Sequence, residues 1–123
     1  MGKQTVLIAD DDPVIVGLLV DVLEMDGYRA VGVEDGMRAL EALDMQTPDL
    51  VILDIMMPGC SGIEVLRRLR ARHETKYTPV VIVSAKRDEM SVWEGLSNGC
   101  DHYITKPFDP SELSSLVRRM LAA

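Results

Sequence analysis

The sequence predicts an α/β protein in which five βα units build a doubly wound parallel sheet. Short runs of apolar, largely β-branched residues alternate along the chain with longer amphipathic stretches, and this alternation is typical of such folds. Three of the short runs, TVLIA, LVIL and PVVIV, are apolar throughout. Strands of this kind suit a parallel sheet that helices cover on both faces. Because no linker, repeat or low-complexity segment interrupts the 123 residues, we expect a single domain over residues 1–123.

The expected strands and helices alternate from the N-terminus onward. The strands are expected at Thr5 to Ala9, Tyr28 to Val33, Asp49 to Asp54, Pro79 to Ser84 and His102 to Thr105. The helices are expected at Pro13 to Asp26, Met37 to Leu43, Ile63 to Arg72, Asp88 to Asn98 and Ser111 to Leu121. Asp12 can cap a helix whose first residue is Pro13. Gly27 and Gly99 stand where the end of a helix favours a left-handed residue.

Composition and charge exclude several classes of function. The chain has 13 Lys and Arg against 20 Asp and Glu, a net charge of -7, which disfavours nucleic acid and anionic lipid as direct partners. The first apolar run ends at three consecutive aspartates, unlike a signal peptide or a membrane span, so we expect a cytoplasmic protein without a membrane contact. Cys60 and Cys100 belong to no CxxC pair or His-Cys cluster, which indicates two buried thiols rather than a disulfide or a zinc site.

Charged or hydroxyl-bearing side chains end four of the predicted strands. These residues are Asp10 and Asp11 after the first strand, Asp54 after the third, Ser84 after the fourth and Lys106 after the fifth. Doubly wound sheets bind ligands at the carboxyl ends of their strands, where the winding reverses. We therefore expect these side chains to form one site.

The aspartates after the first strand favour a site for a hard cation. An N-cap role explains Asp12, but Asp10 and Asp11 continue a buried strand. They would repel each other and Asp54 unless a cation or raised pKa values relieved them. Carboxylate oxygens without a nearby His or Cys suit Mg²⁺.

The remaining residues of the site favour phosphoryl chemistry. Asp54 ends a rigid strand beside a Pro-Gly loop, and next to a metal it is a candidate nucleophile for a phosphoryl group. Taken singly, Ser84 and Lys106 also fit ordinary loop positions. Together they supply a hydroxyl donor and a positive charge for phosphoryl oxygens.

The chain resembles the response regulator receiver domains, the CheY-like phosphoacceptor modules of two-component signalling. The resemblance covers essentially all 123 residues and rests on the segments VLIADDDP, DLVILDIMMPGCSG, VVIVSA and DHYITKPF in the order of the family. It implies the strand order 2-1-3-4-5 and a phosphoryl group accepted on Asp54 from a sensor histidine kinase or a histidine phosphotransferase. It also implies a protein that is not an enzyme with turnover, since it catalyses only its own phosphorylation and slow autodephosphorylation.

By position, the resemblance assigns a Mg²⁺ site to the acidic residues. Asp11 and Asp54 would bind the ion directly, Asp10 mostly through water, and the main-chain carbonyl of Met56 would be a further ligand. The side chains of Met56 and Lys86 would flank the path of the water that hydrolyses the phosphoryl group. A methionine and a lysine there imply slow loss of phosphate.

The resemblance also implies a switch and two partner surfaces. Lys106 corresponds to the invariant lysine of the family, and Ser84 and Tyr103 to its switch pair, which remodels the surface of the fourth helix, fifth strand and fifth helix for a downstream effector. On that surface Trp93 and Leu116 are expected as apolar contact groups. The expected docking residues for the histidine-bearing partner are Val14, Ile15, Leu18, Pro107 and Phe108.

Some interpretations stay open at this point. A Mg²⁺-dependent hydrolase with an aspartate nucleophile would need a second acid or base beside Asp54, and the sequence offers none. A flavodoxin-like cofactor binder would need a phosphate loop after Ala9, which is also missing. A degenerate receiver that acts only as a binding module is the nearest alternative. For the first helix, Val16 and Val20 could be scattered surface residues rather than part of the docking face for the histidine-bearing partner.

Overall fold

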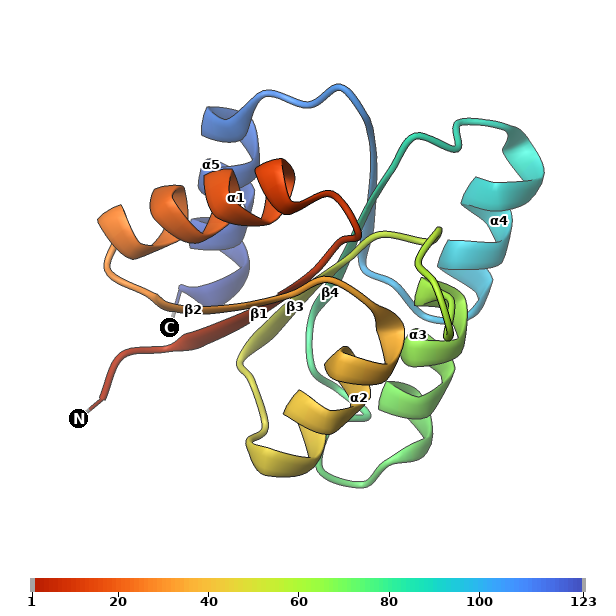
Figure 1. Ribbon diagram of the computed structural model, residues 1–123, viewed down its shortest axis with the longest axis horizontal. Coiled ribbons are helices and arrows are strands. Elements are labelled where there is room, and N and C mark those ends of the chain that lie inside the picture. Colours follow the sequence, from red (N-terminus) through yellow and green to blue (C-terminus); the bar gives the residue numbers. More distant parts are fainter. Residues whose placement is uncertain (1, 123) are drawn as a thin grey trace.

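The computed structural model describes residues 2–122, so Met1 and Ala123 of the predicted domain lie outside the described residues. Five parallel strands form one sheet in the order β2-β1-β3-β4-β5 (Figure 1). The predicted fold class and the strand order implied by the family resemblance are both confirmed.

Each predicted strand and helix is present. The strands are β1 (Thr5–Ala9), β2 (Arg29–Val33), β3 (Leu50–Leu53), β4 (Val80–Ser84) and β5 (His102–Thr105). The helices are α1 (Pro13–Met25), α2 (Gly36–Met45), α3 (Gly62–Ala71), α4 (Glu89–Ser97) and α5 (Pro110–Leu121). Most boundaries differ from the prediction by one residue. The largest difference is the end of α2, which continues past Leu43 to Met45 through two exposed residues.

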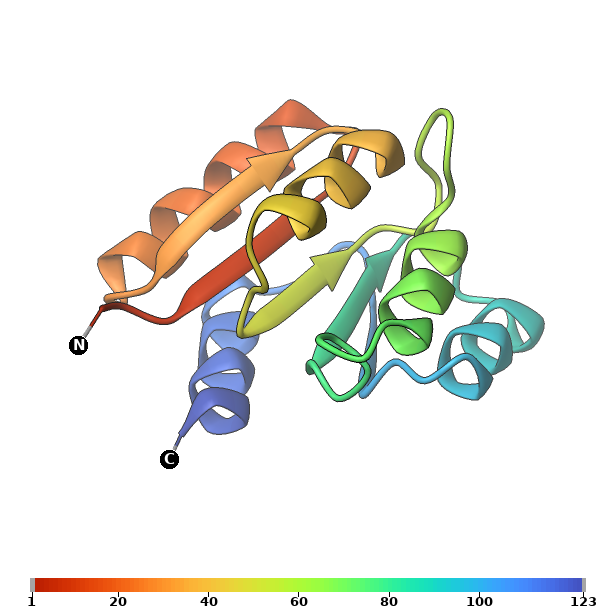
Figure 2. The ribbon, with the colours of Figure 1, turned by 90° about the horizontal axis from the view of Figure 1, so that it is seen from below.

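Helices cover both faces of the sheet, as the apolar strands predicted. The helices α1 and α5 pack on one face, and α2 and α3 pack on the other, with α4 beside α3 (Figures 1 and 2). Alternate residues of β1 belong to the two layers: Leu7 packs with α2 and α3, whereas Ile8 packs with α1 and α5. The three central strands β1, β3 and β4 are buried along their whole length. The core therefore holds the carboxyl ends of these strands in fixed positions.

The helix α1 separates its apolar residues between the core and the surface. Val16, Leu19 and Leu23 are buried, and Val20 packs against the same core layer. The interpretation of Val16 and Val20 as scattered surface residues is therefore wrong. A Cβ atom placed on Gly32 would lie 2.4 Å from Val16, so β2 needs a glycine to let α1 approach.

The helix ends carry the predicted caps. The Asp12 carboxylate accepts a hydrogen bond from the Val14 N–H at 2.9 Å, and Pro13 occupies the first turn. Gly27 and Gly99 adopt φ values of 98° and 102°, in the left-handed region expected after a helix. Both cysteines are buried and free. No helix within residues 2–122 has the length and apolar character needed to cross a bilayer.

Replacing Asp12 by alanine is expected to lower the free energy of unfolding by about 1 kcal/mol, because the Val14 N–H loses its acceptor. Asp12→Asn, which keeps an acceptor at the cap, is the matched control and should cost much less. Urea denaturation followed by circular dichroism measures both. An alanine variant as stable as the wild type would show that the cap contributes nothing.

Candidate functional site

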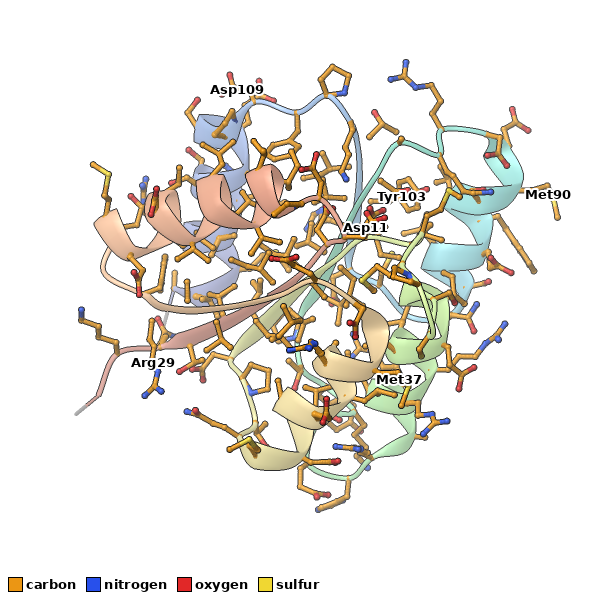
Figure 3. All side chains as sticks on the ribbon, in the orientation of Figure 1. Asp11, Arg29, Met37, Met90, Tyr103 and Asp109 are labelled. Atoms are coloured by element: carbon orange, nitrogen blue, oxygen red, sulfur yellow. The ribbon has the colours of Figure 1, made fainter. Side chains whose placement is uncertain are left out.

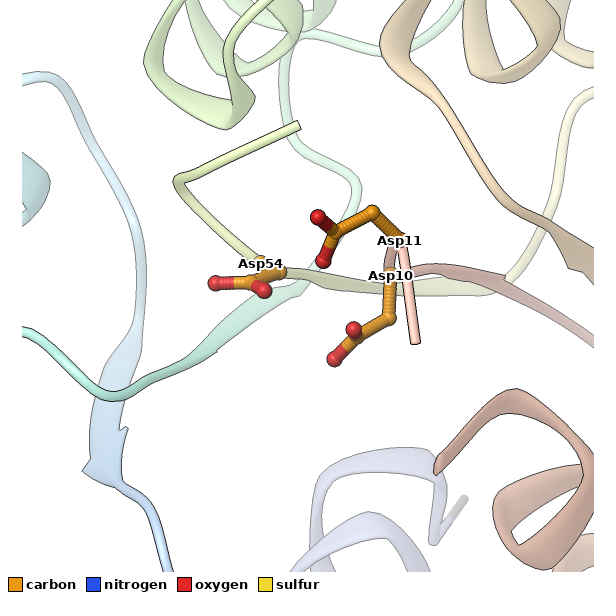
Figure 4. Close-up of side chains that lie close together, drawn as sticks. All are labelled: Asp10, Asp11 and Asp54. Atoms are coloured by element: carbon orange, nitrogen blue, oxygen red, sulfur yellow. The ribbon is translucent and has the colours of Figure 1, made fainter. Parts of the chain in front are cut away.

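The carboxyl ends of three strands bring the predicted site residues together. Asp10 and Asp11 follow β1, Asp54 follows β3, and Lys106 follows β5. One carboxylate oxygen from each of the three aspartates lies within 4.8 Å of the others (Figure 4). Asp10 and Asp54 are 3% and 5% exposed, whereas Asp11 is exposed at the mouth of the site. The site is thus an acidic cluster with two buried carboxylates and one carboxylate open to solvent.

Lys106 reaches across β4 to both buried carboxylates. Its Nζ donates to Asp10 Oδ2 at 2.7 Å and to Asp54 Oδ2 at 3.1 Å. The sequence indicated that the acidic cluster needs a compensating cation, and Lys106 supplies one within the chain itself. The contact with Asp10 joins residues 96 positions apart and was not predicted.

Burial and charge act in opposite directions on these groups. Burial raises the pKa of the Asp10 carboxyl, and the hydrogen bond from Lys106 opposes the rise. Burial by itself would lower the pKa of Lys106, but the hydrogen bonds to Asp10 and Asp54 outweigh it and raise that pKa above its ordinary value. The contacts with the two carboxylates therefore favour the cationic form of the lysine.

The two aspartates after β1 differ in how their oxygens are occupied. Asp10 accepts hydrogen bonds from the Asp12 N–H through Oδ1 and from Lys106 through Oδ2. Within residues 2–122, no hydrogen bond is donated to the Asp11 carboxylate. Asp11 therefore offers two open oxygens to a cation from solvent, whereas each Asp10 oxygen already accepts one hydrogen bond.

Glycine packing fixes the loop that leads away from Asp54. A Cβ atom on Gly62, the first residue of α3, would lie 2.0 Å from the carbonyl oxygen of Asp54. The Gly62 N–H donates to the Ile55 carbonyl at 2.9 Å, and the Ile55 N–H donates to Asp54 Oδ1 at 2.7 Å. The next residue, Met56, has an exposed side chain (60%). The close approach of α3 therefore holds Asp54 and its loop at the pocket.

The two expected switch residues lie beside each other along β4 and β5. Ser84 is 1% exposed, and its hydroxyl accepts a hydrogen bond from the Lys86 N–H at 3.2 Å. The Tyr103 hydroxyl donates to the Lys86 carbonyl at 2.5 Å. The Tyr103 ring lies against Gly95 of α4, where an added Cβ would approach it to 3.0 Å. Both side chains thus converge on one residue of the β4–α4 loop.

The expected docking residues form one apolar surface beside the pocket. Val14 and Leu18 are exposed on α1, at 74% and 39%. Ile15, Leu18, Pro107 and Phe108 line a shallow pocket together with Lys106. The surface therefore borders the residue that contacts Asp54.

The effector surface of α4, β5 and α5 agrees only in part with the prediction. Trp93 is 64% exposed, and Met90 points away from the body of the protein (Figure 3). Leu116, however, is buried in the core with Leu113 and Val117, so its prediction as a surface contact is wrong. These three residues are spaced i, i+3 and i+4 on α5, so they lie on one face of the helix. Leu116 therefore faces the core together with Leu113 and Val117.

Comparison with known proteins gives one family over nearly the whole chain. The profile of the family described as "Response regulator receiver domain" matches residues 6–118. The DNA-binding response regulator MtrA of Mycolicibacterium smegmatis is 43% identical over 119 residues, which make up 97% of this chain and 51% of MtrA. The chain therefore spans about half the length of the curated relatives it matches.

Solved structures give the same fold. The chemotaxis protein CheY4 of Vibrio cholerae superimposes with a TM-score of 0.91 at 28% identity, covering 98% of this chain and 100% of CheY4. The receiver domain of the sensor histidine kinase PA1611 from Pseudomonas aeruginosa PAO1 matches with a TM-score of 0.88 at 26% identity and full coverage of both chains. That structure is described with a magnesium ion coordinated in its active site cleft. The matched residues include the entire candidate site.

Proposed function

The chain belongs to the response regulator receiver domains of two-component systems, and from this premise we propose that Asp54 is the residue that accepts the phosphoryl group. The donor is a phosphohistidine on a sensor histidine kinase or a histidine phosphotransferase. The chain promotes its own phosphorylation and a slow loss of phosphate, without turnover of a separate substrate. The convergence of three carboxylates with Lys106 is the observation that carries this proposal.

The reaction is an in-line transfer in which a carboxylate oxygen of Asp54 attacks phosphorus. The O–P bond forms as the N–P bond to the donor imidazole breaks, and the ring nitrogen keeps the electron pair and takes up a proton. The hydrogen bond from Ile55 orients the Asp54 carboxylate. Lys106 balances negative charge on the phosphoryl oxygens, and the Ser84 hydroxyl donates a hydrogen bond to one of them.

Four residues of the pocket suit a Mg²⁺ ion, which prefers oxygen ligands and keeps several waters. We assign direct ligation to the carboxylates of Asp11 and Asp54 and to the Met56 carbonyl, and a mostly water-mediated contact to Asp10. The open oxygens of Asp11 support its direct ligation, and the short contact of Asp10 with Lys106 supports the water-mediated role of Asp10. When bound, the ion supplies positive charge that offsets the carboxylates and the phosphoryl oxygens.

Acetyl phosphate tests the proposal without a cognate kinase. In the presence of Mg²⁺, intact-mass analysis is expected to show the gain of one phosphoryl group. After removal of divalent ions with EDTA, the gain should disappear and return when Mg²⁺ is restored. A gain that does not depend on the metal would contradict the proposal, and so would no gain by a folded, Mg²⁺-supplied protein.

Loss of phosphate is expected to be slow, because neither Met56 nor Lys86 can act as a base for the attacking water. Both side chains are exposed, in the loops that follow β3 and β4. The double substitution Met56→Asn with Lys86→Glu should speed the decay, because an amide and a carboxylate can orient that water. The decay of the phosphorylated fraction after donor removal measures the effect. Equal decay of the two proteins would contradict the assignment.

The partners follow from the two surfaces. We place the histidine-bearing partner on the surface of Val14, Ile15, Leu18, Pro107 and Phe108, which borders the pocket. We place a downstream effector protein or domain on the surface of α4, β5 and α5, where Trp93 is exposed. The net charge of -7 supports an effector that is a protein rather than nucleic acid bound directly by this domain.

A further inference from the structure

One contact of the β4–α4 loop has no role in the chemistry described so far. Arg87 lies in this loop, three residues beyond Ser84, and its guanidinium donates to the main-chain carbonyl of Lys106 at 2.6 Å. The Lys106 N–H in turn donates to the Ser84 carbonyl at 2.8 Å. Arg87 and Ser84 therefore hold the backbone of Lys106 through its carbonyl and its N–H, respectively.

The same loop is attached to β5 at a second point. The Tyr103 hydroxyl donates to the Lys86 carbonyl, next to Arg87 in sequence. Two consecutive loop residues are thus bonded to the start and the exit of one short strand, β5 (His102–Thr105). The loop that begins at Ser84 and the loop that begins at Lys106 are therefore connected by side chains as well as by the sheet.

We propose that Arg87 is a positioning residue that holds the main chain of Lys106, and with it the Nζ atom, in place for phosphoryl transfer to Asp54. This inference rests on the proposed function. The Lys106 side chain contacts Asp10 and Asp54 through its terminal Nζ atom. The position of that atom therefore depends on where the Lys106 backbone lies. A shift of the exit of β5 would move the ammonium away from both carboxylates.

A guanidinium suits this role better than the ammonium group of a lysine. It is planar and permanently charged, and its several N–H groups point in fixed directions, so a carbonyl acceptor can be held in one orientation. The charge-assisted bond to the Lys106 carbonyl is short, as such bonds are. An aliphatic ammonium at position 87 has a shorter side chain and no fixed direction, so Arg87→Lys should restore only part of the effect.

The test compares initial rates of phosphorylation by acetyl phosphate at saturating Mg²⁺. For Arg87→Ala we expect the maximal rate to fall about three- to tenfold, as the loss of one well-placed hydrogen bond implies, with an unchanged half-saturating concentration of acetyl phosphate. Lys76→Ala is the matched control. It removes one exposed cation from the loop before β4, at the amino end of that strand and away from the site, and should leave both parameters unchanged.

A double-mutant cycle with Lys106→Ala separates positioning from a general structural role. If Arg87 acts through Lys106, removing Arg87 should have little further effect once the lysine side chain is gone. Equal rate losses in the two backgrounds would overturn the proposal, as would wild-type rates in Arg87→Ala. A rise in the half-saturating concentration alone would make Arg87 a donor-binding group and would also overturn it.

Failure of this inference and failure of the proposed function give different results for the wild-type protein. If Asp54 is not a phosphoryl acceptor, the wild-type protein itself gains no phosphoryl group at that residue. If only the role of Arg87 is wrong, the wild type reacts normally and Arg87→Ala reacts equally well. Thermal unfolding of Arg87→Ala, an exposed loop variant, checks that the fold is retained.

Discussion

Asp54→Asn is expected to abolish phosphorylation of the chain by acetyl phosphate and Mg²⁺. The amide has nearly the shape of the carboxylate, but it carries no negative oxygen that can attack phosphorus. The fold should survive, because Lys106 keeps its contact with Asp10 and one of the close, buried carboxylates is no longer charged. Intact-mass analysis of the treated protein measures the result.

The matched control for this variant is Asp21→Asn, which makes the same chemical change on the exposed side of α1. It should gain one phosphoryl group at the rate of the wild type. An Asp54→Asn protein that still gains a phosphoryl group as fast as the wild type would mean that another residue is the acceptor.

Asp11→Asn is expected to weaken Mg²⁺ binding by at least about 100-fold, because it removes a directly bound, charged oxygen. Asp12→Asn removes the neighbouring charge but keeps the helix cap, and it should bind Mg²⁺ nearly as the wild type does. Isothermal titration of the three proteins with Mg²⁺ compares them. If Asp12→Asn lost as much affinity as Asp11→Asn, general negative charge rather than a specific ligand would explain the binding.

The pattern of the sequence determined most of the fold. The central strands were predictable because burial on both faces requires residues that are apolar throughout, as in LVIL. The start of α1 was predictable because Asp12 and Pro13 are the residues that a helix N-terminus favours. The predicted end of α2 is two residues early, because exposed residues such as Asp44 indicate neither helix nor loop. In the structure, the Arg72 guanidinium donates a hydrogen bond to Asp44.

The sequence predicts which residues form the candidate site, but not which of them contact each other. The carboxyl ends of parallel strands meet at one edge, so Asp10, Asp54 and Lys106 could be brought together from their positions alone. The contact of Lys106 with Asp10 depends on how far a flexible side chain reaches across β4, which no local pattern encodes. The bond from Arg87 to a main-chain carbonyl likewise leaves no trace in sequence.

The error at Leu116 has a different cause. The resemblance places the fifth helix on the effector surface, and Leu116 is expected there as an apolar contact. The helical spacing of Leu113, Leu116 and Val117 instead indicates the core, and burial of three apolar side chains on one stripe outweighs the positional argument. Local periodicity is thus the stronger guide where the two disagree.

The location of the phosphoryl group tests the central claim most directly. Borohydride reduces an acyl phosphate to an alcohol, so the phosphorylated aspartate becomes homoserine, which peptide mass spectrometry can locate. The account predicts that the change occurs at Asp54 in protein treated with acetyl phosphate and Mg²⁺, and is missing from protein treated in EDTA. A change at Asp10 or Asp11 instead, with Asp54 unmodified, would contradict it.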